Sequence, residues 1–494
     1  MAYGPTWILF AFFSILNFIF SIILVRYYAD KHESGKLTKI VTVFTLFVPI
    51  LIICIIPLDI YSLRLVTNYP SLKAGYYVIF SFILIISFIV IPFAYFFFEA
   101  EDEDTTTKKK IFSAFRYTAF TFIIVLILLL VGLLVSPGSV PEKGAKNWTK
   151  AMFGSDSADD SMILFPIGCL TLLGCYLFIF YTAYGMGTMP IALLKKKNTE
   201  DHIIDIQNEL NEIRDQKMAI ESREMLTGNQ LTKKELTEIE SLKKKERILS
   251  VETTRYSDVE QGRFEKCSSC LKMCSRFFGL IFLLVSLFLL VAFMASLIER
   301  VFKSECGWRC GFILKEPSLN PFDLFLTSLA KGFPMDFFFL FLFATYILMT
   351  TLVGIIKISV RFLWIKMYRI RKQASPDQGL LLTGLFIMMV SLVMVFQFMN
   401  IAPQYMTFGI GKNVDGMPCS LSDVGVDPNK CKMSMISKLA GRITVKMSFF
   451  AIVYYIFDWI FVILLCIFII VAMKKKVKNT FDGHNSDLES DDGL

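Results

Sequence analysis

Histidine is scarce in this chain of 494 residues, which contains only His32, His202 and His484. The basic segments described below place all three in the cytosol, so the predicted membrane and lumenal parts have no imidazole for a proton relay or a zinc site. The sequence also lacks the P-loop motif G-x-x-x-x-G-K-[ST] and the enzyme motifs H-E-x-x-H and G-x-S-x-G. We therefore expect no P-loop ATPase, no metal site and no enzymatic activity.

Long apolar runs, by contrast, are abundant. Hydrophobic residues make up 55% of the chain and aromatic residues 15%, and the mean hydropathy is +0.57. Nine runs have about 20 or more mostly apolar residues, the length at which a helix crosses about 30 Å of hydrocarbon. Because backbone amides in lipid must pair internally, the sequence predicts an all-α, polytopic integral membrane protein with about nine transmembrane helices. The runs cover residues 6–28, 40–63, 75–98, 116–136, 162–190, 276–298, 333–356, 379–401 and 446–472.

Basic residues predict the sidedness of these spans. No lysine or arginine precedes the first run, whereas Arg26 lies at its end and Lys31, Lys36 and Lys39 follow it. A cleaved signal peptide has the reverse order, so we expect an uncleaved first helix with a lumenal N-terminus. Nine spans then place the C-terminus in the cytosol. The net charge of +8 thus reflects topology and indicates no nucleic-acid partner. Further basic clusters lie in every second loop, at 108–110, 195–197, 361–372 and 474–476.

Two kinds of residue mark the predicted lumenal loops. Asn147-Trp-Thr149 is a glycosylation sequon in the loop after the fourth span. Four of the 11 cysteines also fall in lumenal loops, where three pairings are possible. We expect the local disulfides Cys306–Cys310 and Cys419–Cys431, because each partner is near in sequence and the compartment is oxidising; free buried thiols are the alternative.

The charge pattern divides the chain into four segments. Residues 1–194 carry five spans and residues 276–472 carry four. Between them, residues 195–275 form one large hydrophilic segment in the cytosol. Residues 473–494 form an acidic cytosolic tail that is expected to be disordered.

The hydrophilic segment has the pattern of an antiparallel helical hairpin. Ile206 and Leu210 begin a heptad-like apolar series, and the Thr232–Glu235 string matches a capping box. We expect helices at about 200–226 and 232–255, too short and polar for a catalytic domain. A docking surface for another protein and a rigid spacer are both open interpretations.

Two short patterns near the end of this segment point to trafficking. Tyr256-Ser-Asp-Val259 has the tyrosine-x-x-bulky-apolar form that sorting adaptors recognise. Cys267, Cys270 and Cys274 lie just before the sixth span, where S-palmitoylation and inert thiols are both open interpretations. Sorting adaptors are therefore candidate partners, with a chance match of so short a pattern as the alternative.

Polar side chains inside the apolar runs are the candidates for a functional site. Asp458 lies near the middle of the last span, where an ionised carboxylate costs between about 2.5 and more than 10 kcal/mol. It serves either function or helix packing, and Asn17 in the first span is a candidate partner. Asp59, Asp336 and Gln397 lie near the lumenal ends of their spans and are candidates for a polar vestibule.

Several short strings, taken with the order of the spans, carry a family resemblance. They are Ile56–Ile60, Ile91–Phe96 with the acidic cluster 99–104 after it, Tyr181–Met186 and Phe333–Asp336. In this combination the chain resembles the LMBR/LIMR-type (limb region-like) membrane proteins over nearly its whole length. The hairpin after the fifth span, Ala402-Pro-Gln-Tyr405 and the lysine-then-acidic tail are most similar to the lysosomal cobalamin-transport branch of that family.

This resemblance implies a function. It implies a lysosomal membrane protein required to export cobalamin (vitamin B12) from the lumen to the cytosol, as transporter or as escort. It also implies an ABC-type transporter as partner in the same membrane, which would supply the ATPase that this chain lacks. Cobalamin would then be a transported or bound ligand and not an enzyme cofactor. Relatives that act as plasma-membrane lipocalin-type receptors or signalling adaptors give the alternative function.

Overall fold

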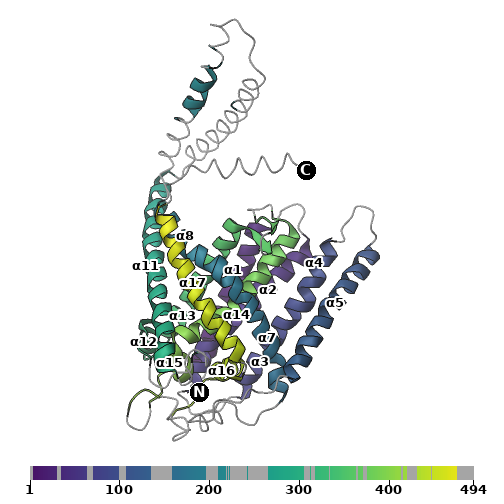
Figure 1. The fold of residues 1–494 in the computed structure, drawn as a ribbon, viewed down its shortest axis with the longest axis vertical. Coiled ribbons are helices and arrows are strands. Elements are labelled where there is room, and N and C mark those ends of the chain that lie inside the picture. Colours follow the sequence, from purple (N-terminus) through teal and green to yellow (C-terminus); the bar gives the residue numbers. More distant parts are fainter. Residues whose placement is uncertain are drawn as a thin grey trace. The chain divides into compact units, whose positions relative to one another are not determined.

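The computed structural model of the chain is predominantly helical (Figure 1). Within the residues that it describes, nine helical stretches are long and apolar enough to cross a membrane, and each lies on one of the predicted runs. The predicted all-α polytopic fold is therefore confirmed. The described residues are 4–29, 35–63, 70–99, 107–134, 158–195, 208, 210–218, 220, 222, 242, 265–304, 312, 318–332, 334–362, 365–370, 375–412, 416–419, 431–446 and 448–474.

Two of the nine spans contain a short π-helix that separates two α-helical parts. The remaining spans are single α-helices. The first to fourth spans are α1 (Gly4–Tyr28), α2 (Lys36–Ser62), α3 (Pro70–Ile85) with η2 (Ile86–Val90) and α4 (Ile91–Glu99), and α5 (Thr107–Leu134). The fifth to ninth are α7 (Ala158–Leu177) with η3 (Phe178–Thr182) and α8 (Ala183–Leu194), α11 (Glu265–Lys303), α13 (Met335–Ile358), α14 (Asp377–Ile401) and α17 (Ser448–Lys474).

Short elements connect some of these spans. A two-stranded antiparallel hairpin, β1 (Val360–Phe362) and β2 (Ile365–Tyr368), lies between α13 and α14. On the predicted lumenal side, α12 (Pro321–Leu329) precedes α13, and α15 (Pro403–Phe408) follows α14 directly. Before α17 the chain forms α16 (Met435–Gly441) and η6 (Arg442–Lys446).

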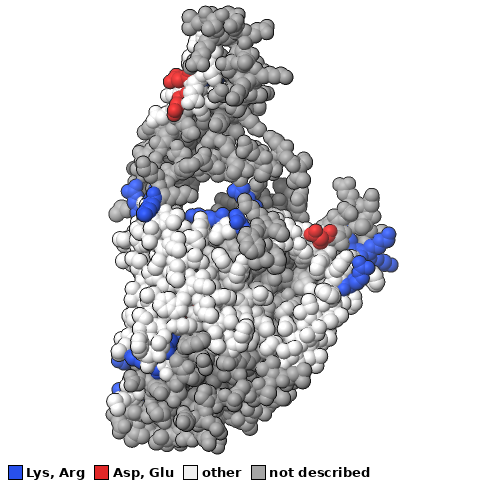
Figure 2. Space-filling view, in the orientation of Figure 1, with Lys and Arg blue, Asp and Glu red and all other residues white. Residues whose placement is uncertain are grey.

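The chain divides into two compact units. Residues 1–188 and 285–471 form the larger unit, which contains most of the membrane-spanning helices. On the face seen in Figure 2, a broad region of this unit has no charged side chains, and lysine and arginine side chains lie at its margins. This distribution is typical of a surface that faces lipid.

The second unit comprises residues 189–284 and 472–494. It holds the described part of the predicted hairpin, in which residues 210–218 are helical. Leu210 and Ile213 are buried and form a small apolar cluster with Leu242. The rest of the hairpin, including residues 223–241, and the tail after Lys474 lie outside the described residues.

α14 forms the centre of the larger unit. It packs against α2, α4, α7 and α13, and 78% of its most apolar window is buried, compared with 17% for the peripheral α5. Most of its buried side chains are apolar, so this centre is a packed core.

Glycines bring the fifth and seventh spans into backbone contact. A Cβ atom on Gly185 would lie 1.8 Å from the carbonyl oxygen of Thr350, and one on Gly354 would lie 2.1 Å from that of Tyr181. No side chain fits at either position. This reciprocal contact holds the fifth span against α13 more closely than side chains would allow.

Candidate functional site

A buried polar cluster joins three spans, and Asp458 on α17 is its centre. Its Oδ1 accepts a hydrogen bond from Gln397 Nε2 at 2.7 Å. Its Oδ2 accepts one from Asn400 Nδ2 at 3.1 Å and one from Arg300 Nη1 at 3.4 Å. All four side chains are buried. The cluster therefore surrounds a carboxylate in the membrane with two amides and a guanidinium.

Arg300 belongs to this cluster because α11 continues past the apolar run that predicts it. The helix extends to Lys303, so its last turns carry charged residues into the bundle. The guanidinium of Arg300 also lies over the ring of Tyr455, 5.6 Å from the ring centroid. One turn earlier, Ser296 donates a hydrogen bond to the carbonyl oxygen of Asn400. Contacts from two successive turns of α11 thus fix it against α14 and α17.

The prediction that Asn17 is a partner of Asp458 is wrong. The Nδ2 of Asn17 instead donates to the carbonyl oxygen of Phe47 on α2, at 3.0 Å, and its Oδ1 is buried without a hydrogen bond in the described structure. Both residues lie in the middle of apolar runs. Two polar groups at a similar depth do not become neighbours unless their helices pack together.

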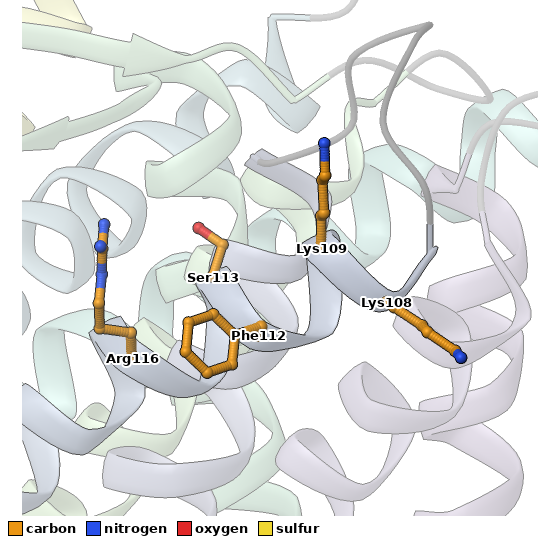
Figure 3. A pocket seen from close by; sticks show the side chains of 5 residues that line it. All are labelled: Lys108, Lys109, Phe112, Ser113 and Arg116. Atoms are coloured by element: carbon orange, nitrogen blue, oxygen red, sulfur yellow. The ribbon is translucent and has the colours of Figure 1, made fainter.

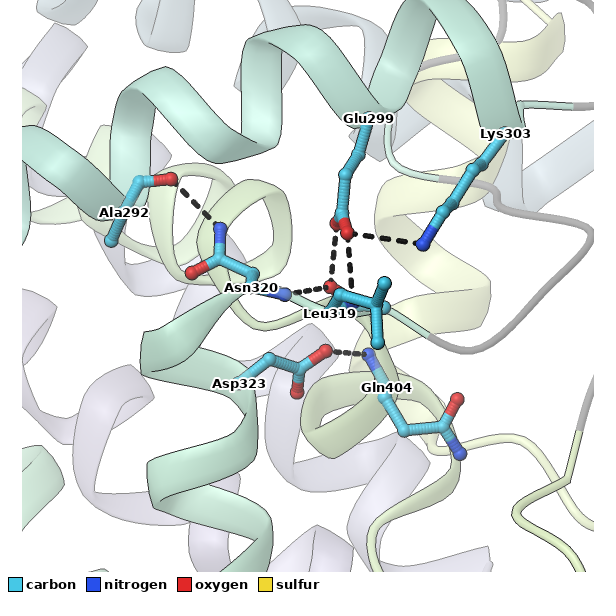
Figure 4. A network of polar contacts seen from close by, with 8 residues as sticks. Ala292, Glu299, Lys303, Leu319, Asn320, Asp323 and Gln404 are labelled. Atoms are coloured by element: carbon cyan, nitrogen blue, oxygen red, sulfur yellow. Dashed lines mark hydrogen bonds and ion pairs between the residues drawn. The ribbon is translucent and has the colours of Figure 1, made fainter.

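A second polar cluster links α12 to the turn after α14 (Figure 4). Asp323 accepts hydrogen bonds from the backbone amides of Gln404 and Tyr405, both at 2.9 Å. The hydroxyl of Tyr405 in turn donates a hydrogen bond, at 3.1 Å, to Oδ2 of Asp336, which lies at the start of α13. Burial raises the pKa of Asp323 to about 7, and the charge of Glu299 also raises it, although the two amides act in the opposite direction.

The end of α11 is attached to the same cluster. Glu299 accepts hydrogen bonds from Ser318 Oγ and from the Leu319 amide, both at 2.7 Å, and pairs with Lys303 at 3.3 Å. Asn320 caps α12 by accepting from the Phe322 amide, and it donates to the carbonyl oxygen of Ala292 on α11 (Figure 4). These contacts fix α12 beside the last turns of α11.

Asp59 forms a third, separate junction. It accepts hydrogen bonds from the amides of Met435 and Ile436, at 3.2 and 2.9 Å, and from the hydroxyl of Tyr76 at 3.3 Å. Asp59, which lies on α2, therefore caps the N-terminal end of α16. The candidates Asp59, Asp336 and Asp458 are each buried and have different hydrogen-bond partners. The vestibule candidates Asp59, Asp336 and Gln397 belong to three different junctions among the described residues.

A disulfide between Cys419 and Cys431, with 5.6 Å between the Cα atoms, closes the loop before α16. Gln404 Nε2 donates to the carbonyl oxygen of Cys419 at 3.1 Å, so this loop contacts the segment that Asp323 holds. Five other predicted site residues lie outside the described residues. These are Asn147, Tyr256, Val259, Cys306 and Cys310.

Arg300 and Asp323 are two of the site residues that sequence reasoning missed. For Arg300, the available signal was the absence of any helix-breaking residue between the sixth apolar run and Arg300. For Asp323, the signal was Asn320-Pro321, an N-cap residue followed by proline at the first helical position, which predicts a short helix between the sixth and seventh apolar runs.

The chemistry available to this site is limited. No group of three or more His, Cys, Asp or Glu side chains that could hold a metal ion occurs among the described residues. The described carboxylates of the three junctions accept hydrogen bonds within the protein. The geometry is suited to holding helices in defined positions.

Residues 6–276 match the model of the family described as LMBR1-like membrane protein. The chain is 34% identical to the probable lysosomal cobalamin transporter of Dictyostelium discoideum, with 98% of each chain covered. It is 26% identical to the lysosomal cobalamin transport escort protein LMBD1 of Xenopus laevis, with 99% of this chain and 98% of that one covered. No solved structure matches the chain.

Proposed function

Since the chain belongs to the LMBR1-like membrane protein family, we propose that it is a multi-pass protein of the lysosomal membrane required to export cobalamin to the cytosol. The observation that carries this proposal is the similarity to relatives named for lysosomal cobalamin transport along almost the full length of both chains. The similarity is not limited to the family-wide region at residues 6–276. Cobalamin is thus the proposed cargo, and the chain does no chemistry on it.

Of the two roles, transporter and escort, the packing of the larger unit favours escort. α14 is buried at the centre among four other helices. The cavity between α1, α2, α13 and α14 has a volume of about 10 Å³, too small for cobalamin at that place, since sites for small molecules have about 300–1,000 Å³. An ABC-type transporter in the same membrane would then bind ATP and move the cargo, and this chain would position or stabilise it.

The proposal includes a sidedness for the chain. We place the N-terminus, the disulfide loop and Asn147 in the lumen, and the hairpin and the C-terminal tail in the cytosol, on the basis of the basic loops. In this arrangement Asn147 is accessible for glycosylation. The Tyr256–Val259 motif faces sorting adaptors, and the Asp458 and Asp323 clusters lie toward the lumenal half.

Loss of the chain from cells tests the cobalamin role. We expect free cobalamin to accumulate in lysosomes and the cytosolic pool to fall, and re-expression should reverse both. A normal cytosolic pool in such cells would refute the role. Plasma-membrane localisation at steady state, with lumenal loops that bind an extracellular protein, would instead support the receptor alternative.

Reconstitution tests the escort role. Vesicles that are loaded with labelled cobalamin and contain only the purified chain should release no more label than loaded vesicles without protein. Co-reconstitution with the ABC-type transporter and ATP should give release that depends on both proteins. Release by the chain alone would show that it is itself the transporter.

A further inference from the structure

The cytosolic end of α5 has a basic depression on the surface of the larger unit. The depression has a volume of about 430 Å³ and is lined by Lys108, Lys109, Phe112, Ser113 and Arg116 (Figure 3). Three cations, one hydroxyl group and one aromatic ring thus come from little more than two turns of a single helix. None of these residues takes part in the polar clusters described above.

Three of these side chains share one face of the helix. Lys109, Ser113 and Arg116 are spaced four and three residues apart, which places them in one row along α5. In Figure 3, Lys109 and Ser113 point to the same side of the helix. Arg116 donates a hydrogen bond to the hydroxyl of Tyr117 and lies over its ring, 5.1 Å from the centroid. This contact restrains the guanidinium at the edge of the apolar belt.

The same row continues as an apolar strip toward the middle of the membrane. Phe120, Ile123 and Ile127 follow Arg116 at spacings of four, three and four residues, and each is more than half exposed. α5 packs against α4 and α7 with its opposite face, and only 17% of its most apolar window is buried. One exposed face thus combines cations at the membrane boundary with apolar side chains at the depth of acyl chains.

We propose that this face of α5 binds an acidic phospholipid of the cytosolic leaflet whose headgroup carries a phosphate monoester. Lys109, Ser113 and Arg116 would donate hydrogen bonds to the phosphate oxygens, and Phe120, Ile123 and Ile127 would contact the acyl chains. A phosphate monoester fits better than a diester because it carries close to two negative charges and has three acceptor oxygens. Basic clusters at the cytosolic end of a span attract such lipids.

Purified full-length protein in vesicles provides the test. The vesicles contain phosphatidylcholine with a small fraction of a fluorescent phosphatidylinositol monophosphate, and energy transfer to a label on the protein reports binding. The double variant K109Q/R116Q should bind this lipid about thirtyfold more weakly, and S113A about tenfold more weakly. Equal size-exclusion profiles and helicity establish that the variants fold.

The matched control is R26Q/K36Q, which removes two exposed cations from the cytosolic ends of α1 and α2. It should bind the lipid as the unchanged protein does. An equal loss in both double variants would attribute binding to the general basic margin and overturn the proposal, as would no loss in K109Q/R116Q. Preference for phosphatidylserine, or complete displacement by an equal concentration of soluble inositol phosphate, would also overturn it.

The acidic residues Glu101–Asp104 precede the depression in the sequence and give a further arm of the test. They carry four negative charges within eight residues of Lys109 in the sequence, and negative charge near a basic cluster weakens its attraction for an anionic headgroup. Replacing all four by amides should therefore strengthen lipid binding. Weaker binding in that variant would contradict the proposal.

Discussion

Replacing Asp458 by asparagine should destabilise the protein more than replacing its partner Arg300 by glutamine. In Asp458→Asn the guanidinium of Arg300, whose side chain is 3% exposed, loses this counter-charge. Removing one partner of a buried ion pair costs about 3–5 kcal/mol. In Arg300→Gln the carboxylate keeps the amide donors of Gln397 and Asn400, so we expect a smaller loss of about 1–3 kcal/mol.

The double variant Arg300→Gln/Asp458→Asn should be more stable than the sum of the two losses predicts. It leaves a cluster of neutral amides with no buried charge, so a double-mutant cycle should give a coupling energy of at least about 2 kcal/mol. Lys303→Gln is the matched control, because Lys303 pairs with Glu299 on the same helix at 3.3 Å but is 21% exposed. Its cost should stay below about 1 kcal/mol.

Chemical unfolding of the purified protein in detergent measures these free energies. The reasoning is refuted if Asp458→Asn costs no more than Lys303→Gln, or if the coupling energy is below about 0.5 kcal/mol. Cobalamin export by the double variant then separates the two interpretations of Asp458. Normal export with restored stability would make the cluster a packing device, and loss of export would give it a functional role.

Three further outcomes are expected. Gly185→Ala should abolish folding, because its methyl group would meet the Thr350 carbonyl. Gly332→Ala should purify normally, because a Cβ there would lie 3.8 Å from its nearest neighbour, the carbonyl oxygen of Leu329. The pKa of Asp323 is raised to about 7, so the folded protein keeps a proton that the unfolded chain releases above about pH 4. The free energy of unfolding should therefore fall as the pH rises from about 4 toward 7, by up to about 1.4 kcal/mol per pH unit. Asp323→Asn should flatten that profile, measured by thermal unfolding in detergent. Cys419→Ser should cost about 3 kcal/mol in the same assay, since the disulfide closes a loop with a sequence separation of 12, and reductant should then have no further effect.

The membrane-spanning fold could be predicted because one physical requirement dominates it. Each span needs about 20 apolar residues, and that signal is local in the sequence. The residues at which the helices begin and end were less predictable. α5 begins at Thr107, nine residues before the predicted run, because lysines in its first turn reach the aqueous boundary with long side chains. α11 ends at Lys303, five residues after its predicted run, because Glu299 and Arg300 have partners inside the protein.

The site was less predictable because its contacts are between residues far apart in the chain. Asp458 was recognisable as costly from its position alone, but Arg300 lies 158 residues before it and was not identified. Asn17 was proposed as its partner only because both residues are polar and near the middle of a span. Which helices pack together depends on their glycines and on tertiary contacts, and no local pattern carries that information.

Polar contacts and glycine contacts hold different parts of the larger unit. Between membrane helices, lipid removes most of the hydrophobic driving force for association, so close packing and hydrogen bonds have to supply it. Gly185 and Gly354 supply close packing between the fifth span and α13, toward the predicted cytosolic side. The Asp458 and Asp323 clusters supply hydrogen bonds at the predicted lumenal ends. Because these contacts are buried and α14 is covered on several sides, the surfaces open to the proposed membrane partner are those of the peripheral spans.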